Sequence, residues 1–207
     1  MATTRPPPEH ASLFDSFRRL IGWMRANGAP LLVDNLAPGV SPAQLVKLQG
    51  KLGFMLPSGL RAMWLLHDGQ RKPLNGFVGP LHLLPVAWVL NERVRTQSLL
   101  ARLRARPGDW ADLGVTADEA GSDAWLPFAA RGPTSLVVHA VSGRVFAGDL
   151  DDDAAPLALV ADSVPQWLAS YADSVEAGEF ELLSGHGDYH LAPIDPELDA
   201  AEAPDET

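Results

Sequence analysis

Apolar residues recur at every third or fourth position in several stretches of the chain, which is the spacing of amphipathic helices. In the first stretch Leu13, Phe17, Leu20 and Met24 share one face, which predicts a helix over about residues 10–27. The same spacing predicts four more helices, over about residues 42–52, 57–68, 86–104 and 164–177.

Proline, serine and glycine residues mark the ends of the predicted helices. Ser41 is a capping residue followed by Pro42 at the first helical position, where the missing N–H of proline is no loss. Ser163 and Gln166 have the spacing of a capping box, in which each side chain satisfies a backbone N–H. Gly69 is expected to end the third helix, because glycine readily takes the left-handed conformation.

The second half of the chain is predicted to contain strands. Residues 124–129, 135–140 and 144–148 are short runs rich in apolar and β-branched residues. Ser142-Gly143 lies between the last two runs and favours a tight turn, since glycine accepts the positive φ that such turns need. Residues 157–160 are predicted to add an edge strand.

The pattern divides the chain into three parts. Residues 1–9 are expected to be a flexible N-terminus, and residues 10–183 are expected to form one domain. Inside this domain, residues 31–33 are predicted to be a strand or an extended connector, and residues 105–123 a loop or insertion. Residues 184–207 are rich in acidic residues, alanine and proline, and are expected to be a disordered tail.

Charge is distributed unevenly along the chain. The net charge is −10, but all 16 basic residues lie in residues 1–144, together with 10 acidic ones. Residues 145–207 hold the other 16 acidic residues and no basic ones. An acidic surface repels nucleic acid and attracts basic proteins, so the charge predicts a protein partner and no nucleic acid. A purely solubilising role of the acidic tail is the alternative.

What the sequence lacks excludes several classes of protein. It has no cysteine, which rules out disulfides and thiolate metal sites and fits a reducing compartment. No apolar run approaches the ~20 residues of a membrane-spanning helix. Residues 1–10 have no apolar core of a secretory signal. The chain is therefore expected to be cytoplasmic, without a membrane partner.

No group of residues in the sequence has the spacing of a catalytic or cofactor site. There is no Gly-x-Ser-x-Gly elbow and no glycine-rich phosphate loop. Asp149 and Asp151 to Asp153 lack the glycine and the distal glutamate of a calcium loop. His186 and His190 could suggest a metal site, but they fall in the predicted tail. The sequence therefore predicts no enzyme, no cofactor and no metal site.

Two groups of residues, taken in order, resemble a known family. The first group contains Ser41-Pro42, Leu56-Pro57, Leu60-Arg61, Leu65-Leu66 and Asp68-Gly69. The second contains Trp125-Leu126-Pro127, Gly132, the Val145-to-Asp149 strand, Ala161-Asp162-Ser163 and Trp167-Leu168. Over about residues 38–180 their order and spacing resemble the SUKH superfamily of Smi/Knr-type domains. That superfamily includes yeast cell-wall-synthesis regulators and bacterial immunity proteins of polymorphic toxin systems.

The resemblance implies a fold and a function. The implied fold is α+β, a SUKH-like single domain with a central, mostly antiparallel sheet flanked by helices. The implied function is that of an immunity protein, which binds a cognate toxin and occludes its active site. An adaptor or regulatory module of the same fold is the alternative. A small-molecule or enzymatic role would need an enclosed polar pocket.

The acidic loops, in which the sequence departs most from the family pattern, are expected to bind the partner. Many toxins of these systems are nucleases with basic clefts, and an acidic loop can enter such a cleft by mimicking phosphate charge. The expected partner-binding residues lie in these loops or at the ends of the family-like segments beside them: Asp68, Gln70, Asp123, Asp149, Asp151, Asp152 and Asp153. The identity of the toxin and the oligomeric state are left open.

Overall fold

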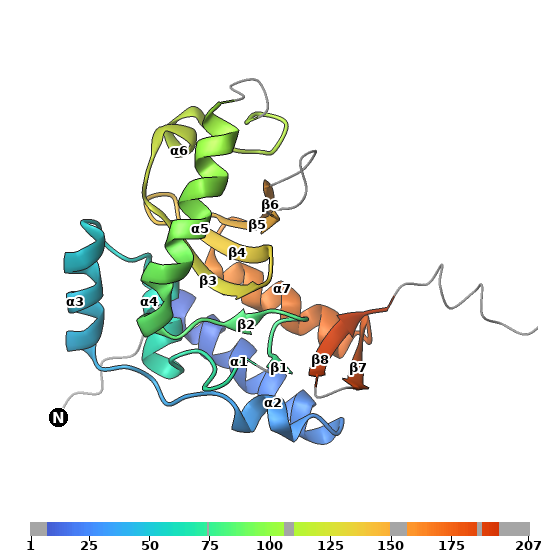
Figure 1. The fold of residues 1–207 in the computed structure, drawn as a ribbon. Helices are drawn as coiled ribbons and strands as arrows, with labels where there is room; N and C mark the ends of the chain where they lie inside the picture. Colours follow the sequence, from blue (N-terminus) through green and yellow to red (C-terminus); the bar gives the residue numbers. More distant parts are fainter. Residues whose placement is uncertain (1–7, 74, 106–109, 150–156, 186–187, 195–207) are drawn as a thin grey trace, which may run out of the picture.

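The computed structural model describes residues 8–73, 75–105, 110–149, 157–185 and 188–194. Within these ranges the helices are α1 (Pro8–Ala26), α2 (Pro30–Asp34), α3 (Pro42–Leu52), α4 (Ser58–Leu66), α5 (Val86–Arg104), α6 (Ala117–Gly121) and α7 (Val164–Glu176) (Figure 1). The strands are β1 (Asn75–Gly76), β2 (His82–Leu83), β3 (Trp125–Arg131), β4 (Thr134–His139), β5 (Val145–Asp149), β6 (Leu157–Ala161), β7 (Phe180–Gly185) and β8 (Asp188–Pro193).

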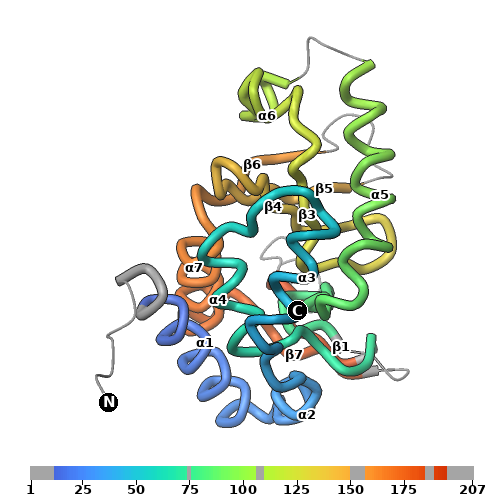
Figure 2. The backbone as a smooth tube through the Cα atoms, turned by 90° about the vertical axis from the view of Figure 1, so that its left-hand side faces the viewer, coloured from blue at the N-terminus to red at the C-terminus, as the bar shows by residue number. Residues whose placement is uncertain are grey.

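Five of these strands form the central sheet. Their order is β2-β3-β4-β5-β6, and every neighbouring pair is antiparallel. Helix α5 covers one face of the sheet, while α7 and α1 lie on the other (Figure 2). Over the part of the chain that the structure describes, the expected α+β domain with a mostly antiparallel sheet between helices is confirmed.

The side chains of the sheet alternate between two hydrophobic cores, because successive residues of a strand point to opposite faces. Leu126 and Phe128 belong to the larger core, together with apolar residues of α1, α4 and α7. Trp125, Val137 and Phe146 belong to the second core, together with apolar residues of α5. The sheet is thus buried on both faces over β3 and β4, whereas Ala158, Leu159 and Val160 of the edge strand β6 are exposed. Among the described residues, a partner can therefore reach this edge of the sheet.

The two groups of family-like residues meet where α4 and α7 begin. A Cβ added to Gly59 would lie 2.5 Å from Cδ of Pro165, so these two helix starts touch with no room for a side chain. At the other end of α4, Nε1 of Trp64 donates a 3.0 Å hydrogen bond to the backbone oxygen of Leu84. These residues therefore build the scaffold of the domain.

The C-terminal segment departs from the prediction. Strands β7 and β8 form a hairpin that pairs Phe180 with Pro193, and β8 also runs parallel to β1. Leu191 of β8 is completely buried in the larger core. The expected disorder from residue 184 onward is wrong for the residues of β7 and β8, because strand pairing and burial outweigh their acidic composition. Residues 195–207 lie outside the described ranges.

Three shorter segments also differ from the prediction. Helix α1 begins at Pro8, so the expected flexible N-terminus is already helical there, and residues 1–7 lie outside the described ranges. Residues 31–33 belong to helix α2, because Pro30 opens a helix whose apolar side is buried. The predicted loop over residues 105–123 contains helix α6, which a capping box of Thr116 and Glu119 starts.

Helix α4 ends earlier than predicted. Its last residue is Leu66, and the backbone of His67 is already extended, with φ −141°. Gly69 has φ 62°, but it lies three residues beyond the helix. A Cβ added there would lie 2.5 Å from the backbone oxygen of Leu83. Glycine is therefore needed at this position because the backbone of residues 83–85 lies too close for a side chain.

Candidate partner-binding surface

The predicted partner-binding residues do not lie on one surface. Asp123 precedes Trp125, the first residue of β3, whereas Asp149 is the last residue of β5. Arg131, the last residue of β3, pairs with Thr134, and Thr134 also pairs with Asp149. Asp123 and Asp149 therefore lie near opposite ends of β3, and a strand of this length spans about 20 Å.

Asp149 lies where the acidic run leaves the sheet. Its side chain is partly buried, and Oγ1 of Thr134 donates a 3.2 Å hydrogen bond to its Oδ2. The chain is described again from Leu157, which pairs with Gly148 of β5. The three other aspartates of the run lie outside the described residues: Asp151, Asp152 and Asp153. The acidic run thus connects β5 to the edge strand β6.

Asp123 is tied to helix α5. Its Oδ1 accepts a 2.9 Å hydrogen bond from Nη1 of Arg104, and its backbone oxygen accepts one of 2.7 Å from Nη2 of Arg93. The carboxylate side chain is 73% exposed, so water screens the ion pair and the pair adds little stability. Asp123 is accessible to a partner, but Arg104 offsets its charge.

Gln70 belongs to the core. It is only 1% exposed. Its Oε1 accepts hydrogen bonds from the backbone N–H groups of Phe77 at 3.2 Å and of Leu83 at 3.0 Å. The expectation that Gln70 contacts a partner is therefore wrong, because its amide is used inside the domain to satisfy two buried donors.

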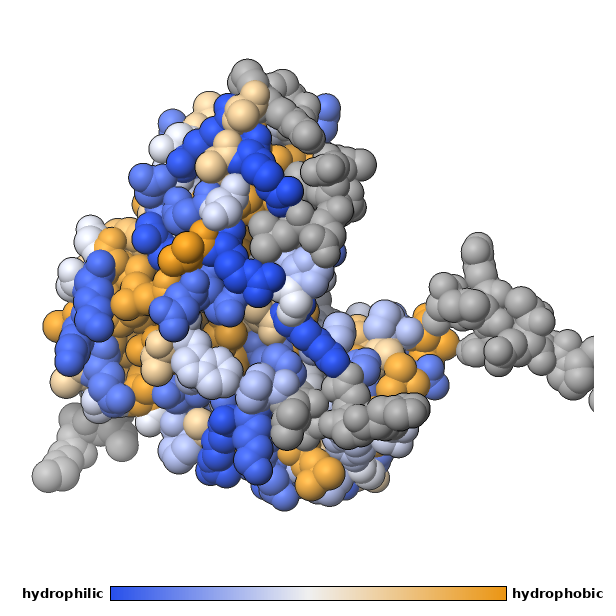
Figure 3. Space-filling view, viewed as in Figure 1, coloured by the Kyte–Doolittle hydropathy of each residue, from blue (hydrophilic) through white to orange (hydrophobic). Residues whose placement is uncertain are grey.

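Asp68 holds the start of helix α5. Its Oδ1 accepts a 2.7 Å hydrogen bond from the backbone N–H of Val86. Burial raises the pKa of the Asp68 carboxyl, while the hydrogen bond from Val86 acts in the opposite direction. Asp68 also borders a hollow of about 260 Å³ between α3 and α5, where Figure 3 shows an apolar area.

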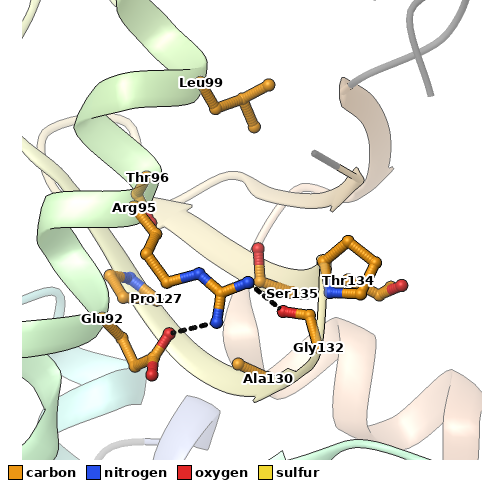
Figure 4. A pocket seen from close by; sticks show the side chains of 10 residues that line it. Glu92, Arg95, Thr96, Leu99, Pro127, Ala130, Gly132, Thr134 and Ser135 are labelled. Atoms are coloured by element: carbon orange, nitrogen blue, oxygen red, sulfur yellow. Dashed lines mark hydrogen bonds and ion pairs between the residues drawn. The ribbon is translucent and has the colours of Figure 1, made fainter. Parts of the chain in front are cut away.

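A second hollow lies between α5 and the turn that joins β3 to β4 (Figure 4). Arg95 crosses it: Nη1 lies 3.9 Å from Oε2 of Glu92, and Nη2 donates a 2.5 Å hydrogen bond to the backbone oxygen of Gly132. The remaining volume is about 10 Å³, which is room for about one water molecule. This hollow is too small for a substrate.

A cluster around Glu119 has the residue types of a catalytic triad but not its geometry. Oγ of Ser142 donates a 2.7 Å hydrogen bond to Oε1 of Glu119 and lies 3.0 Å from Nδ1 of His139. In a triad the histidine stands between the hydroxyl and the carboxylate, whereas here the serine does. Nη1 of Arg144 lies 2.7 Å from the other carboxylate oxygen. The cluster therefore ties α6 to the turn between β4 and β5.

Burial and charge shift the pKa of both titratable members of this cluster. Burial lowers the pKa of His139; the charge of Glu119 opposes this shift and that of Arg144 adds to it. Burial raises the pKa of Glu119, but hydrogen bonds from Ser142 and Thr116 and the charge of Arg144 bring it below its usual value. The 3.8 Å approach of His139 to Glu119 is thus no ion pair near neutral pH, because the imidazole is uncharged.

The described ranges contain neither a metal-binding cluster nor a membrane-spanning helix. No group of three or more histidine, aspartate and glutamate side chains in these ranges is placed to hold a metal ion. His190 lies in β8, and His186 is outside the described residues. Of the helices described, none combines the length and the apolar character that crossing a membrane requires.

Sequence reasoning missed the apolar residues that the domain leaves on its surface. Trp88 and Val94 of α5 are 37% and 67% exposed, and Leu159 and Val160 of β6 are 38% and 45% exposed. Helical or strand spacing marks such residues as candidates for the core. Only the packing of the neighbouring elements shows that these four are not covered completely.

Residues 39–170 match the family model of the SMI1 / KNR4 family (SUKH-1). The matched range contains all five strands of the central sheet, and it runs from the segment before α3 into α7. A comparison with curated proteins gives no match.

Proposed function

Since the chain belongs to the SMI1 / KNR4 family (SUKH-1), we propose that it is an immunity protein that binds and neutralises a cognate bacterial toxin. Domains of this family are generally immunity or regulatory proteins rather than enzymes. In this proposal the protein acts in the cytoplasm and covers the active site of the toxin. A nuclease with a basic substrate cleft is the toxin class that the charge of the chain fits best.

The observation that supports this proposal best is the position of Asp149, the first residue of the acidic run, at an end of the sheet. Both faces of the sheet are buried over β3 and β4, and Asp149 stands where β5 ends, followed in sequence by three more aspartates. Charge pairing at such a position raises the association rate and selects the partner. Apolar contacts must supply most of the binding energy, and Leu159 and Val160 of β6 are exposed close by in sequence.

A pair of charge variants tests the role of the acidic run. The first replaces Asp149, Asp151, Asp152 and Asp153 by serine. The control replaces Glu197, Asp199, Glu202 and Asp205 by serine, which removes the same charge further along the chain. The partner in this test is the toxin encoded by the neighbouring gene. The association rate of the first variant is expected to be at least about tenfold lower at low salt, and to change less as salt rises. Equal rates for both variants would refute the role of the acidic run.

A regulatory adaptor of the same fold is the second candidate. The family match favours it as well, because domains of this family include regulatory proteins besides immunity proteins. The gene neighbourhood separates the two candidates. A large secreted toxin gene directly upstream supports the immunity protein, whereas its absence together with a stable host partner supports the adaptor.

A further inference from the structure

The hollow between α3 and α5 has an apolar floor and a basic rim. Leu48 of α3 and Leu90 of α5 line the floor, together with Ala87, while Lys47 and Lys51 of α3 line one side. We call this hollow the α3–α5 groove. The two lysines are four residues apart, so they lie on the same side of helix α3.

The basic rim carries unpaired charge. Among the described residues, no carboxylate lies within ion-pair distance of Lys47 or Lys51. Asp68 is the one carboxylate that lines the groove, and it already accepts a hydrogen bond from Val86. The groove therefore offers two ammonium groups to an incoming carboxylate.

The apolar floor continues along α5. Ala87, Leu90 and Val94 are spaced by three and four residues, so they form one stripe on the helix. Leu90 is partly buried and Val94 is 67% exposed. Ala87 and Leu90 line the groove and Val94 follows one helical turn further along α5, so the stripe fits the side chains of a third helix that is laid into the groove and extends beyond it. The groove volume of about 260 Å³ is below the range typical of small-molecule pockets.

We propose that the α3–α5 groove binds an acidic amphipathic helix of a protein partner. Apolar side chains of that helix pack on Leu48, Ala87 and Leu90, and its carboxylates pair with Lys47 and Lys51. A second copy of the chain is a poor occupant, because a symmetric contact at this groove would bring like-charged lysines together. This surface is separate from the acidic run, and it selects a partner segment of the opposite charge.

A pair of synthetic helices tests the proposal directly. The acidic probe has about 16 residues, enough for four turns, with leucine at helical spacing and glutamate on both flanks. The basic probe replaces every glutamate by lysine. Fluorescence anisotropy with the full-length protein is expected to show at least about tenfold tighter binding of the acidic probe, with an affinity that falls as salt rises. Equal affinity for the two probes would overturn the proposal.

Matched variants locate the binding site. The double variant Lys47→Glu with Lys51→Glu is expected to lose its preference for the acidic probe. The control Arg25→Glu with Lys72→Glu changes the charge equally at exposed positions outside the groove and is expected to keep this preference.

A second pair of variants tests the apolar stripe. Val94→Glu is expected to weaken binding of the acidic probe. Val141→Glu, at a position 80% exposed on the β4–β5 turn, is expected to leave this binding unchanged. Equal losses within either pair would overturn the assignment. So would a dimer in analytical ultracentrifugation that Val94→Glu dissociates, since the occupant would then be a second copy.

Discussion

At the scale of single residues, the polar side chains of the core connect segments that are distant in sequence. Gln70 accepts hydrogen bonds from two separate segments, and the hydroxyl of Tyr171 on α7 donates to the backbone oxygen of Phe77 and accepts from the N–H of Gly79. Burial raises the pKa of Tyr171, with the hydrogen bond from Gly79 opposing it, so the hydroxyl stays protonated. These side chains hold residues 77–83 in place.

Replacing Gln70 tests its role in stability. Gln70→Ala leaves two buried N–H groups without their acceptor, and each costs about 1–3 kcal/mol, so a loss of about 2–6 kcal/mol is expected in urea unfolding. The control is Gln97→Ala, which removes one exposed hydrogen bond to the backbone oxygen of Asp123 and is expected to cost less than about 1 kcal/mol. Similar losses for both variants would show that Gln70 does not support the core.

The lowered pKa of His139 predicts that the protein loses stability in mild acid. As pH falls below about 6.5, the unfolded chain binds a proton that the folded imidazole does not, which favours unfolding. His67 adds to the same effect, because burial lowers its pKa, although its hydrogen bond with the backbone oxygen of Ala37 opposes this shift. Glu119, with its lowered pKa, adds a further loss as pH falls below its ordinary value of about 4.5.

The measurement is the free energy of urea unfolding between pH 7.5 and about pH 5. The wild-type protein should lose stability as pH falls, and His139→Gln should flatten this dependence because it removes one of the groups that titrate. An unchanged slope in the variant would mean that His139 is protonated equally in the folded and unfolded states.

At the scale of elements, the segments predicted correctly are those whose ends carry local signals. Ser41 and Gln44 form a complete capping box at the start of α3, and α5 occupies the predicted range of residues 86–104. The predicted box at α7 forms only in part: Oγ of Ser163 accepts from the N–H of Gln166, but Oε1 of Gln166 accepts from the N–H of Asp162. Helix α2 and strand β8 depend on distant partners, so spacing along the chain could not reveal them.

The contact between the starts of α4 and α7 predicts opposite effects for two glycine substitutions. Gly59→Ala places a methyl group against Pro165 and is expected to cost about 1–3 kcal/mol of stability. Gly50→Ala in α3 meets nothing within 4 Å and is expected to add about 0.5–1 kcal/mol, because alanine favours the helix. Thermal or urea unfolding measures both. A neutral Gly59→Ala would show that the two helix starts do not touch.

Two leucines of the β7–β8 hairpin test whether this segment is part of the folded domain. Leu191 is completely buried and Leu183 is 42% exposed. Leu191→Ala is expected to cost about 2–5 kcal/mol, and Leu183→Ala to cost less than about 1 kcal/mol. If neither substitution changed the unfolding midpoint, the segment after residue 184 would be disordered, as its composition suggests.

At the scale of the whole molecule, the uneven charge of the sequence becomes only in part a spatial separation, because Asp173 and Glu176 of α7 pair with Arg19 of α1. Arginines such as Arg93, Arg95 and Arg104 lie on α5, whereas α7 carries Asp173 and Glu176, and the central sheet stands between these helices (Figure 2). The acidic run begins at one end of the sheet, and the α3–α5 groove lies beside the basic helix. The two proposals together give the domain two protein-binding surfaces of opposite charge, the acidic run and the α3–α5 groove.

The candidate site was less predictable than the fold. The sequence places Asp68 and Gln70 in or beside a predicted loop, but in the structure both side chains accept hydrogen bonds from backbone N–H groups. Asp123 is offset by Arg104, which lies 19 positions away and cannot be recognised as its partner from spacing. Asp149 keeps its predicted position at the end of a strand, because strand ends follow from the local pattern.

Neutralisation of the toxin tests the central proposal most directly. The measurement is the survival of cells that produce the toxin domain encoded by the neighbouring gene, with and without this chain, scored together with co-purification of the two proteins. The predicted result is that the wild-type chain restores growth and co-purifies with the toxin. The variant with serine at residues 149, 151, 152 and 153 is predicted to protect the cells less well than the control with serine at residues 197, 199, 202 and 205. The proposed function would be contradicted if both proteins are soluble in the same cells, yet survival does not improve and no complex is recovered.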